Sequence, residues 1–216
     1  MAVVDIWRWK LDSPDIQVLN TEEVARSDRF VFDRDRARYV AGRGRLRRIL
    51  GRYLGQKPQQ VEFHFGPFGK PEIDGLSFNM SHTGDYAVLG VVQGDIPMGI
   101  DVETIRPIEL AVAETHFAPA ECAALRALPD SEKCDAFHRI WTRKEAYLKA
   151  WGTGLSTDLN SFTVSITPNA PCLLGCESGE ADEWNILNVD APLGIVGALA
   201  IRTGDRDVRL VEKEWC

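Results

Sequence analysis

Two acidic residues near the middle of the chain are spaced for metal chemistry. They lie in the segment Gly99-Ile100-Asp101-Val102-Glu103. Side chains alternate between the two faces of a β-strand, so Asp101 and Glu103 project from the same face. Two neighbouring carboxylates repel each other unless a cation neutralises them, and Mg²⁺ prefers carboxylate and phosphate oxygens as ligands. The pair suggests a magnesium site, and the alternative is an acidic strand end exposed to water.

A third carboxylate and a cation occur in the segment from Trp141 to Lys149. Glu145 and Lys149 are four residues apart, so they share one face of a predicted helix. In the functional interpretation, Glu145 adds a metal ligand and Lys149 meets phosphate oxygens. In the alternative they form a surface ion pair, which contributes only about 0.3 kcal/mol.

Two turn segments have groups that suit phosphate oxygens. Ser81-His82-Thr83-Gly84 places side-chain and backbone donors where a predicted strand runs into a turn. In Phe68-Gly69-Lys70, the glycine permits close approach of the backbone and the lysine provides a point charge. Ordinary turns are the alternative for both. A serine and a histidine that are adjacent in sequence are poorly placed to act as nucleophile and base.

A basic stripe lies between Arg29 and Arg52, where nine arginines accompany only two acids, Asp33 and Asp35. The chain as a whole has a formal net charge of −7, which disfavours general nucleic-acid binding. A basic region in an acidic protein indicates a local anionic partner, and a solvated arginine-rich face is the alternative. The sequence contains no phosphate loop of the GxxxxGK[ST] form.

Periodicity and turn residues predict the elements that must position these side chains. Helices are predicted to start at Asn20, to run from a cap at Asp33 to Gly55, and to cover Pro119 to Leu128 and Ser131 (N-cap) to Trp151, followed by Gly152. Strands are predicted at Val3 to Trp9, Val61 to Phe65, Leu76 to Met80, Tyr86 to Val92, Met98 to Glu103, Phe162 to Ile166, Trp184 to Val189, Gly194 to Ile201 and Val208 to Val211. This order predicts an α+β fold of two similar halves, residues 1–104 and 105–216, each with a helix and antiparallel-looking strands, and with a site at their junction.

Composition limits the other classes of function. The 216 residues are 44% hydrophobic and 26% charged, which is typical of globular proteins. No apolar run approaches the roughly 20 residues of a membrane helix, and the N-terminus lacks the pattern of a secretory signal, so we expect a cytoplasmic protein without a membrane partner. Five cysteines without a CxxC pair and four histidines without HxxxH spacing disfavour zinc.

Four segments, taken in order, resemble the 4'-phosphopantetheinyl transferases. They are FGKPEI from Phe68, SHTGDYAVLGV from Ser81, GIDVE from Gly99 and WTRKEAYLKAWGTGL from Trp141. The length and the two-half layout resemble the surfactin-synthetase type, a monomeric pseudo-dimer, rather than the shorter trimeric holo-acyl-carrier-protein synthases. The resemblance extends from about Arg26 to Phe162, and the GID-x-E and W-x-x-KEA-x-x-K motifs are its most specific part.

The resemblance implies a role for each candidate residue. Asp101, Glu103 and Glu145 match the magnesium ligands, Glu145 also matches the proposed base for the carrier serine, and Lys149 matches a lysine that assists the departing phosphate. Contacts with coenzyme A are implied at Arg26, Arg38, Phe68, Gly69, Lys70, Ser81 and His82. The chain departs from the family at Glu23, where a lysine of the phosphate site is often found, and Arg29 is a candidate to compensate.

The implied reaction is the magnesium-dependent transfer of 4'-phosphopantetheine from coenzyme A to a serine of an acyl or peptidyl carrier protein, which releases adenosine 3',5'-bisphosphate. The W-KEA motif leans toward carriers of fatty-acid or polyketide biosynthesis. We expect a monomer that meets an acidic carrier transiently through electrostatic attraction. Two alternatives share the same residues: a magnesium phosphodiesterase, and a non-catalytic module that binds coenzyme A or a carrier without strong magnesium dependence.

Overall fold

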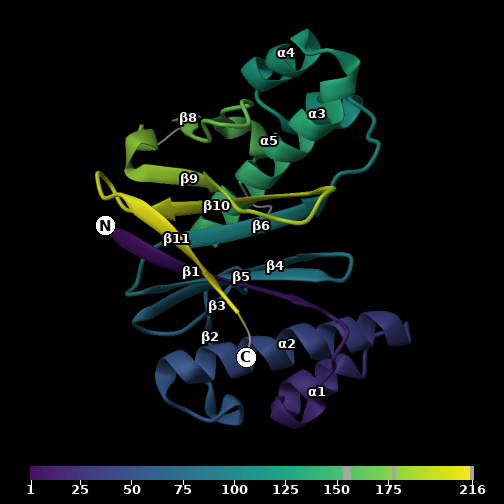
Figure 1. The fold of residues 1–216 in the computed structure, drawn as a ribbon, viewed down its shortest axis with the longest axis vertical. Helices are drawn as coiled ribbons and strands as arrows, with labels where there is room; N and C mark the ends of the chain where they lie inside the picture. The colour runs from purple at the N-terminus through teal and green to yellow at the C-terminus, as the bar shows by residue number, and fades with distance from the viewer. Residues whose placement is uncertain (153–156, 177–178, 215–216) are drawn as a thin grey trace.

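The computed structural model describes residues 1–152, 157–176 and 179–214, which form two larger sheets and two short strand pairs (Figure 1). The first sheet has the order β11-β1-β5-β4, formed by Val208–Lys213, Ala2–Lys10, Tyr86–Gln93 and Leu76–Thr83. The second has the order β6-β10-β9, formed by Met98–Thr104, Ile195–Arg202 and Trp184–Asn188. The short pairs are β2 with β3 (His64–Phe65, Pro71–Glu72) and β7 with β8 (Thr163–Val164, Leu173–Gly175).

Helices cover the outer faces of the two sheets. They are α1 (Thr21–Ser27), α2 (Asp33–Leu54), α3 (Ala111–His116), α4 (Pro119–Ala127) and α5 (Asp130–Trp151), with short 3₁₀ turns at Ile16–Val18, Pro58–Gln60, Leu159–Ser161 and Ala181–Glu183. The order of layers is α2, first sheet, second sheet, α5 (Figure 1). None of the described helices combines the length and the apolar character that crossing a membrane requires.

Alternation along β1 explains how one strand serves two hydrophobic cores. Trp7 and Trp9 pack in the core beneath α2, whereas Val4 and Ile6 point the other way and pack between the two sheets. This is the period of two that a β-strand imposes. Ile6 is fully buried, and burial of a side chain of this size stabilises the fold by roughly 1.5–3 kcal/mol.

Three predicted helix ends are confirmed. Asn20 caps α1, since its side chain accepts from the Glu23 amide at 2.9 Å while the Glu23 carboxylate accepts from the Asn20 amide at 3.0 Å. Gly55 and Gly152 end α2 and α5 in the left-handed conformation, with φ of 63° and 72°.

Two predicted caps are misplaced, one by one residue and the other by two. Asp33 is the first residue of α2, and Phe32 occupies the N-cap position. Ser131 lies inside α5, which begins at Asp130 after Pro129. Acidic residues stabilise the first turn as well as the cap position, so their presence does not settle which residue begins the helix.

Two predicted strands are much shorter than expected because buried cations take their carbonyl groups. Of Val61 to Phe65 only β2 is a strand, since the Val61 carbonyl accepts from Arg47 Nη1 at 2.9 Å. Of Phe162 to Ile166 only β7 is a strand, since the Phe162 carbonyl accepts from Lys144 Nζ at 2.5 Å.

Helix α3, which covers Ala111–His116, was not predicted from the sequence.

The last strand departs from the expected antiparallel pairing. β11 runs parallel to β1, with Ala2 opposite Val208 and Trp7 opposite Lys213. The end of the predicted second half therefore lies in the sheet of the predicted first half. The boundary at residues 104 and 105 stays a prediction.

A row of polar side chains on β4 joins the two sheets. β4 and β6 are edge strands of different sheets. Alternate β4 side chains accept hydrogen bonds from backbone amides in and just before β6: Ser77 from Ile96 (2.8 Å), Asn79 from Ile100 (2.9 Å), Ser81 from Val102 (3.3 Å) and Thr83 from Thr104 (3.1 Å). These bonds satisfy amides that an exposed sheet edge would leave unpaired, and they fix the register of the strand that carries Asp101 and Glu103.

Candidate active site

Gly99 allows α5 to lie directly on β6. A Cβ atom at this position would lie 2.1 Å from the Ala146 carbonyl oxygen and 2.4 Å from the Ala150 amide nitrogen. Only a glycine permits such close approach of two backbones. Glu145 and Lys149 flank this contact on the helix, while Asp101 follows it on the strand. The glycine of the GIDVE segment therefore brings the two acidic motifs together.

Asp101 is the centre of a buried polar cluster. It is 4% exposed, and its Oδ1 accepts from Ser81 Oγ at 2.8 Å and from Lys149 Nζ at 2.6 Å. Lys149 Nζ also donates to Ser81 Oγ at 3.1 Å. The other carboxylate oxygen, Oδ2, is buried and accepts no hydrogen bond from any residue that the structure describes. The cluster thus keeps one buried anionic oxygen open to a further cation or donor.

Glu103 and Glu145 share the electrostatic field of Asp101. Burial raises the pKa of Glu103, and the charge of Asp101 raises it further, whereas Arg106 and Lys149 oppose this shift. Burial and the charges of Asp101 and Glu103 likewise raise the pKa of Glu145, against the effect of Lys149. Three carboxyl groups and one lysine therefore influence one another at this junction of β6 and α5.

The residues fit a hard cation in their chemistry, although they are not arranged as a finished cage. Among the described residues, no group of three or more His, Cys, Asp and Glu side chains is close enough to hold a metal ion. The chemistry of the donors nevertheless suits such an ion, because Asp101 Oδ2 is a buried carboxylate oxygen without a hydrogen-bond partner among the described residues, and hard cations bind carboxylate oxygens.

A cavity of about 690 Å³ lies between α1, α2, β4 and the β2–β3 turn. Its lining combines apolar side chains, such as Leu11 and Met80, with charged ones, such as Arg26 and Arg43. Four of the predicted coenzyme A contacts line it, namely Arg26, Arg38, Gly69 and His82. His82 lines the cavity and directly follows Ser81, which binds Asp101, so it lies between the cavity and the Asp101 cluster. Desolvation lowers the pKa of His82, and the charges of Lys149 and Arg38 lower it further, against the charge of Asp101. The volume of the cavity is in the range found for small-molecule binding sites.

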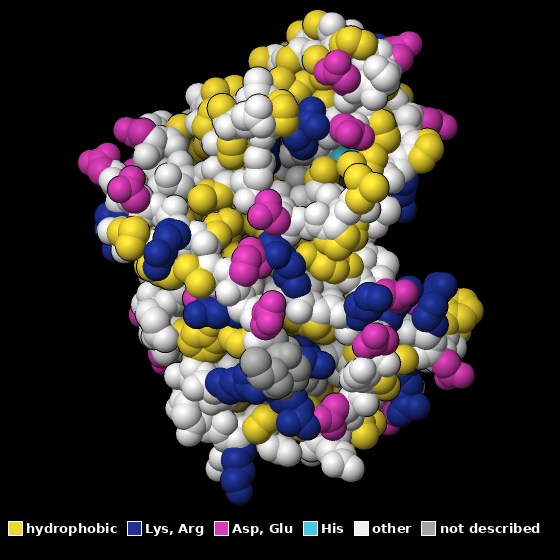
Figure 2. Space-filling view, in the orientation of Figure 1, with side chains coloured by type: hydrophobic (Ala, Val, Ile, Leu, Met, Phe, Trp, Pro, Cys, Tyr) yellow, Lys and Arg dark blue, Asp and Glu magenta, His cyan; other side chains and the backbone are white. Residues whose placement is uncertain are grey.

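The cations of the cavity differ in how far they are neutralised. Arg43 pairs with Glu23, and Arg38 pairs with Asp85 at 2.7 Å. Arg26 lies over the ring of Tyr39 at 5.5 Å, and among the described residues it forms no ion pair. Figure 2 shows Lys and Arg side chains gathered over the lower part of the molecule, where α2 lies. The basic stripe is thus largely paired on this helix, and Arg26 is a candidate for an incoming anion.

Glu23 is expected to stabilise the fold above acidic pH. Burial opposes its charge, but hydrogen bonds and charges of Arg47 and Arg43 together lower the pKa of Glu23 below 4.5. A carboxyl group whose pKa is lower in the folded protein than in the unfolded chain stabilises the fold at pH values above its unfolded-state pKa. This stabilisation is lost as the pH falls through the folded-state pKa. We expect Glu23→Gln to cost about 2–4 kcal/mol of unfolding free energy at pH 7, measured by urea denaturation.

The difference between Glu23→Gln and wild type should narrow as pH falls below 4.5, the ordinary value for this carboxyl group. Glu22→Gln provides the matched control, since Glu22 is the exposed neighbour on the same turn of α1. It should change stability by less than about 0.5 kcal/mol. A loss at Glu23 that is independent of pH would contradict the assignment.

Lys70 and Phe68 lie differently from the other predicted contacts. Neither is among the described residues that line the cavity, and Phe68 is 60% exposed. Lys70 Nζ donates to two backbone carbonyl groups, those of Met98 at 3.0 Å and Ala150 at 3.1 Å. Ser81 is also outside the described lining, and it is bound to Asp101.

Sequence reasoning did not select most of the residues that line the cavity, among them the polar residues Tyr39, Arg43 and Asn79. Tyr39 and Arg43 are four residues apart and share one face of α2, so helical periodicity could have selected them together. Asn79 had no such signal. Its role becomes visible only through its bond to the Ile100 amide, next to Asp101.

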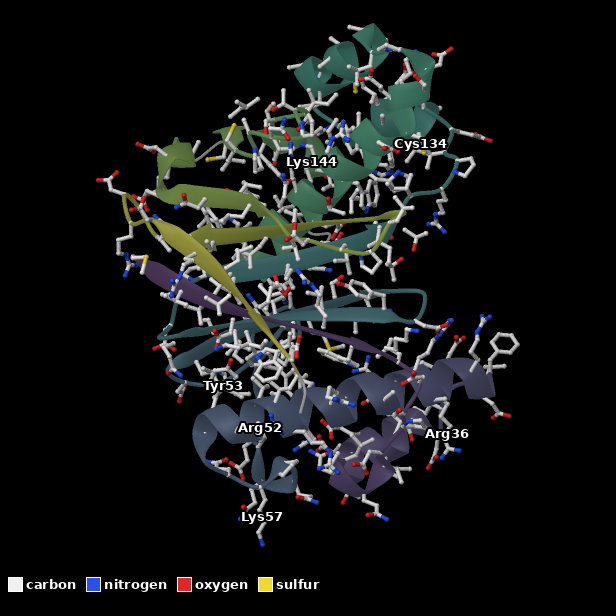
Figure 3. The ribbon with its side chains drawn as sticks, in the orientation of Figure 1. Arg36, Arg52, Tyr53, Lys57, Cys134 and Lys144 are labelled. Atoms are coloured by element: carbon white, nitrogen blue, oxygen red, sulfur yellow. The ribbon has the colours of Figure 1, made fainter. Side chains whose placement is uncertain are left out.

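Lys144 precedes Glu145 in the motif but has a structural role. Its side chain is fully buried where α5 packs against the segment around Phe162 (Figure 3). The Nζ atom contacts Glu121 at 2.8 Å and the Leu159 carbonyl at 2.7 Å. Loss of one partner leaves an unpaired buried charge. We expect Lys144→Met to cost about 3–5 kcal/mol of unfolding free energy in a denaturant titration.

Removal of both charges should cost less than removal of one. Lys144→Met combined with Glu121→Leu is expected to recover part of the loss. The recovery is incomplete because Glu121 also accepts from the Ala118 and Val164 amides. Lys133→Met, which breaks an ion pair with the exposed Asp130, serves as the control and should have little effect. Equal stability of Lys144→Met and wild type would contradict the assignment.

Known proteins match both parts of the chain. Residues 97–196 match the 4'-phosphopantetheinyl transferase superfamily, and residues 10–93 match the N-terminal domain of 4'-phosphopantetheinyl transferases. The chain is 40% identical over 212 residues to the 4'-phosphopantetheinyl transferase HetI of Nostoc sp., which covers 92% of this chain and 87% of that protein. The chain therefore belongs to the 4'-phosphopantetheinyl transferase superfamily, a family of enzymes, and the predicted family and α+β class are confirmed.

Two further relatives show how far the similarity extends. The 4'-phosphopantetheinyl transferase Sfp of Bacillus subtilis is 31% identical over 151 residues, which cover 68% of this chain and 66% of that protein. The crystal structure of Thermotoga maritima holo-[acyl-carrier-protein] synthase matches with a TM-score of 0.41 and 20% identity over 51% of this chain and 65% of that chain. The second likeness is too slight to support an argument about the fold.

Proposed function

We propose that this protein transfers the 4'-phosphopantetheine moiety of coenzyme A to a serine of an apo carrier protein, giving holo carrier and adenosine 3',5'-bisphosphate, with Mg²⁺. One observation carries the proposal. The buried Asp101 cluster, with Ser81 and Lys149, adjoins a cavity of about 690 Å³ whose lining includes Arg26, Arg38 and Arg43. The cavity fits a nucleotide with several phosphates. The cluster beside it fits a site that stabilises the charge developing during the reaction.

The cavity would hold the nucleotide end of coenzyme A. Arg26 and Arg38 supply cations for its phosphates, with His82 at the border of the carboxylate cluster. Gly69 lets the backbone approach the ligand, and the exposed Phe68 offers a ring to the adenine at the hairpin tip. Ser81 would contact the phosphates from below while it stays bound to Asp101.

Asp101, Glu103 and Glu145 would hold the magnesium ion. The open Asp101 Oδ2 and the raised pKa values of both glutamates support this set. When bound, the ion neutralises charge on the pyrophosphate of coenzyme A and on the leaving group.

The chain's own residues would move the proton and stabilise the leaving phosphate. The serine oxygen of the carrier forms a bond to the phosphorus that bears pantetheine, and the bond from this phosphorus to the bridging oxygen breaks. Glu145 would take the serine proton, because a carboxylate within hydrogen-bond reach of the hydroxyl can act as its base. Lys149 lies at 2.6 Å from Asp101 and would stabilise the electron pair that departs with adenosine 3',5'-bisphosphate.

We further propose that residues 1–104 and 105–216 act as two halves of one monomer, with the active site at their junction. The support is that Asp101 and Ser81 precede this boundary whereas Glu145 and Lys149 follow it. One chain thus supplies every proposed site residue, and no second copy is needed.

Intact-mass spectrometry tests the function directly. Apo acyl carrier protein and apo peptidyl carrier protein are each incubated with the enzyme, coenzyme A and Mg²⁺, with EDTA in a parallel sample. We expect a mass gain of one phosphopantetheine that EDTA abolishes. A preference for the acyl carrier would agree with the W-KEA motif at Trp141.

The same mixtures separate the alternatives. Release of adenosine 3',5'-bisphosphate without any gain in carrier mass would favour a phosphodiesterase. Coenzyme A binding with neither product would favour a non-catalytic module. A mass gain that persists in EDTA would contradict the magnesium dependence but keep the transfer reaction.

A further inference from the structure

Lys70 connects three parts of the chain that are distant in sequence. It precedes β3 in the turn of the β2–β3 pair. Its Nζ donates to the carbonyl of Met98, the first residue of β6, and to the carbonyl of Ala150, in the last turn of α5. These partners are 28 and 80 residues away along the sequence. One side chain therefore holds the beginning of the acidic strand against the end of the acidic helix.

The contact with α5 is the kind that a helix end requires. The last four carbonyl groups of an α-helix lack amide partners within the helix, and a cation there is favoured by the helix dipole. Ala150 belongs to this set, because α5 ends at Trp151 and turns left-handed at Gly152. A Cβ atom on Gly152 would lie 3.2 Å from Lys70 Cδ, so the lysine stem packs against this turn.

Both anchored segments lead directly into the active site. Met98 is followed by Gly99 and then, two residues on, by Asp101. Ala150 follows Lys149, whose Nζ binds Asp101 at 2.6 Å. A shift of the α5 end relative to β6 would therefore change the distance between the lysine and the carboxylate.

The hairpin that carries Lys70 also forms a wall of the cavity. Phe65, Gly69 and Pro71 line the cavity, whereas Lys70 between them points toward β6 and α5. Burial lowers the pKa of Lys70, and the charge of Glu72 opposes this shift. Lys70 is half-buried, and its donors are taken up by the two carbonyl groups.

We propose that Lys70 is a positioning residue that ties the cavity wall to the end of α5 and so holds Glu145 and Lys149 against Asp101. This inference rests on the proposed transfer reaction. It differs from the phosphate contact that the sequence suggests for Lys70, because a phosphate contact acts on the binding of coenzyme A whereas a positioning residue acts on the rate of the chemical step.

Steady-state kinetics of Lys70→Met separates the two roles. Methionine has a similar length but cannot donate to the two carbonyl groups. We expect kcat to fall by about 10- to 100-fold, with the KM for coenzyme A changed by less than about threefold. Lys70→Arg, which restores the donors, should recover much of the kcat. Lys57→Met is the matched control, since Lys57 is an exposed lysine at the far edge of the same half (Figure 3).

The outcome that would overturn the proposal is a raised KM for coenzyme A with an unchanged kcat. Lys70→Gln retains a donor for one carbonyl and is expected to give an intermediate kcat, so the series does not depend on a single folded variant. Thermal melting of each variant shows whether the fold is kept.

Native-state hydrogen exchange gives a readout that does not need the reaction. In Lys70→Met without substrates, the amides of residues 148–152 should exchange faster, while those of α2 stay unchanged. Unchanged exchange at this turn would contradict the positioning role even if kcat fell. Absence of transfer by the wild-type enzyme would refute the proposed function, whereas the exchange result would still report on the contact of Lys70 with α5.

Discussion

Glu145→Gln is expected to reduce turnover by about 10²- to 10⁴-fold while the protein stays folded. Glutamine has the shape of glutamate but cannot accept a proton from the carrier serine, and it removes one of three acidic groups from the site. The measurement is the rate of holo carrier formation by intact mass, with saturating coenzyme A and Mg²⁺.

The stability of this variant gives a second, independent expectation. Burial and the charges of Asp101 and Glu103 raise the pKa of Glu145, so the folded state disfavours its ionised form. A carboxyl group whose pKa is raised by folding destabilises the protein at pH values above its folded-state pKa. The destabilisation disappears as the pH falls below the unfolded-state pKa. In EDTA at pH 8, Glu145→Gln should therefore melt at the same temperature as wild type or higher.

Glu132→Gln provides the control on the same helix, because Glu132 is exposed in the first turn of α5. It should leave both turnover and melting temperature near the wild-type values. Turnover of Glu145→Gln at the wild-type rate would refute the proposed base, and a large drop in its melting temperature would show that the carboxylate has a structural role instead.

Gly99→Ala is expected to damage both the fold and the site. The added methyl group would lie 2.1 Å from the Ala146 carbonyl oxygen, and a backbone atom cannot move aside as the end of a side chain can. The helix must shift away from β6. Overpacking of this kind costs about 1–3 kcal/mol and occasionally more, which corresponds to a fall in melting temperature of roughly 2–12 °C for a chain of this size.

The same shift should reduce turnover by about 10²-fold or more, because Glu145 and Lys149 move together relative to Asp101. Gly175→Ala is the matched control, since a Cβ atom on this strand glycine would meet no described atom within 4 Å. It should alter stability and turnover very little. Wild-type activity of Gly99→Ala would show that α5 does not need to lie so close to β6.

Local patterns in the sequence were sufficient for much of the candidate site. The alternation in GIDVE placed Asp101 and Glu103 on one strand, and the spacing of Glu145 and Lys149 placed them on one helix. These predictions held because strand and helix periods depend only on the backbone geometry of neighbouring residues. The capping box at Asn20 and the terminal glycines at positions 55 and 152 follow from equally local rules.

Features that depend on distant partners were out of reach of such patterns. The lengths of β2 and β7 were overestimated, since Arg47 and Lys144 take carbonyl groups that a strand would have used. The pairing of β11 with β1 joins segments about 200 residues apart, and no local pattern in the sequence predicts it. The roles of the basic stripe were also hidden, because pairing of Arg43 with Glu23 neutralises a cation that looks available in the sequence.

The sequence by itself therefore determined the family, the α+β class and the residue types that the chemistry needs, because these follow from short segments with a fixed local geometry. Only the tertiary structure decided how those segments meet: that Gly99 lets α5 rest on β6, that Asp101 binds both Ser81 and Lys149, and that Lys70 holds two carbonyl groups instead of lining the cavity. The physical reason is that close packing and hydrogen-bond satisfaction are settled between residues far apart in the chain, where no local preference distinguishes one partner from another.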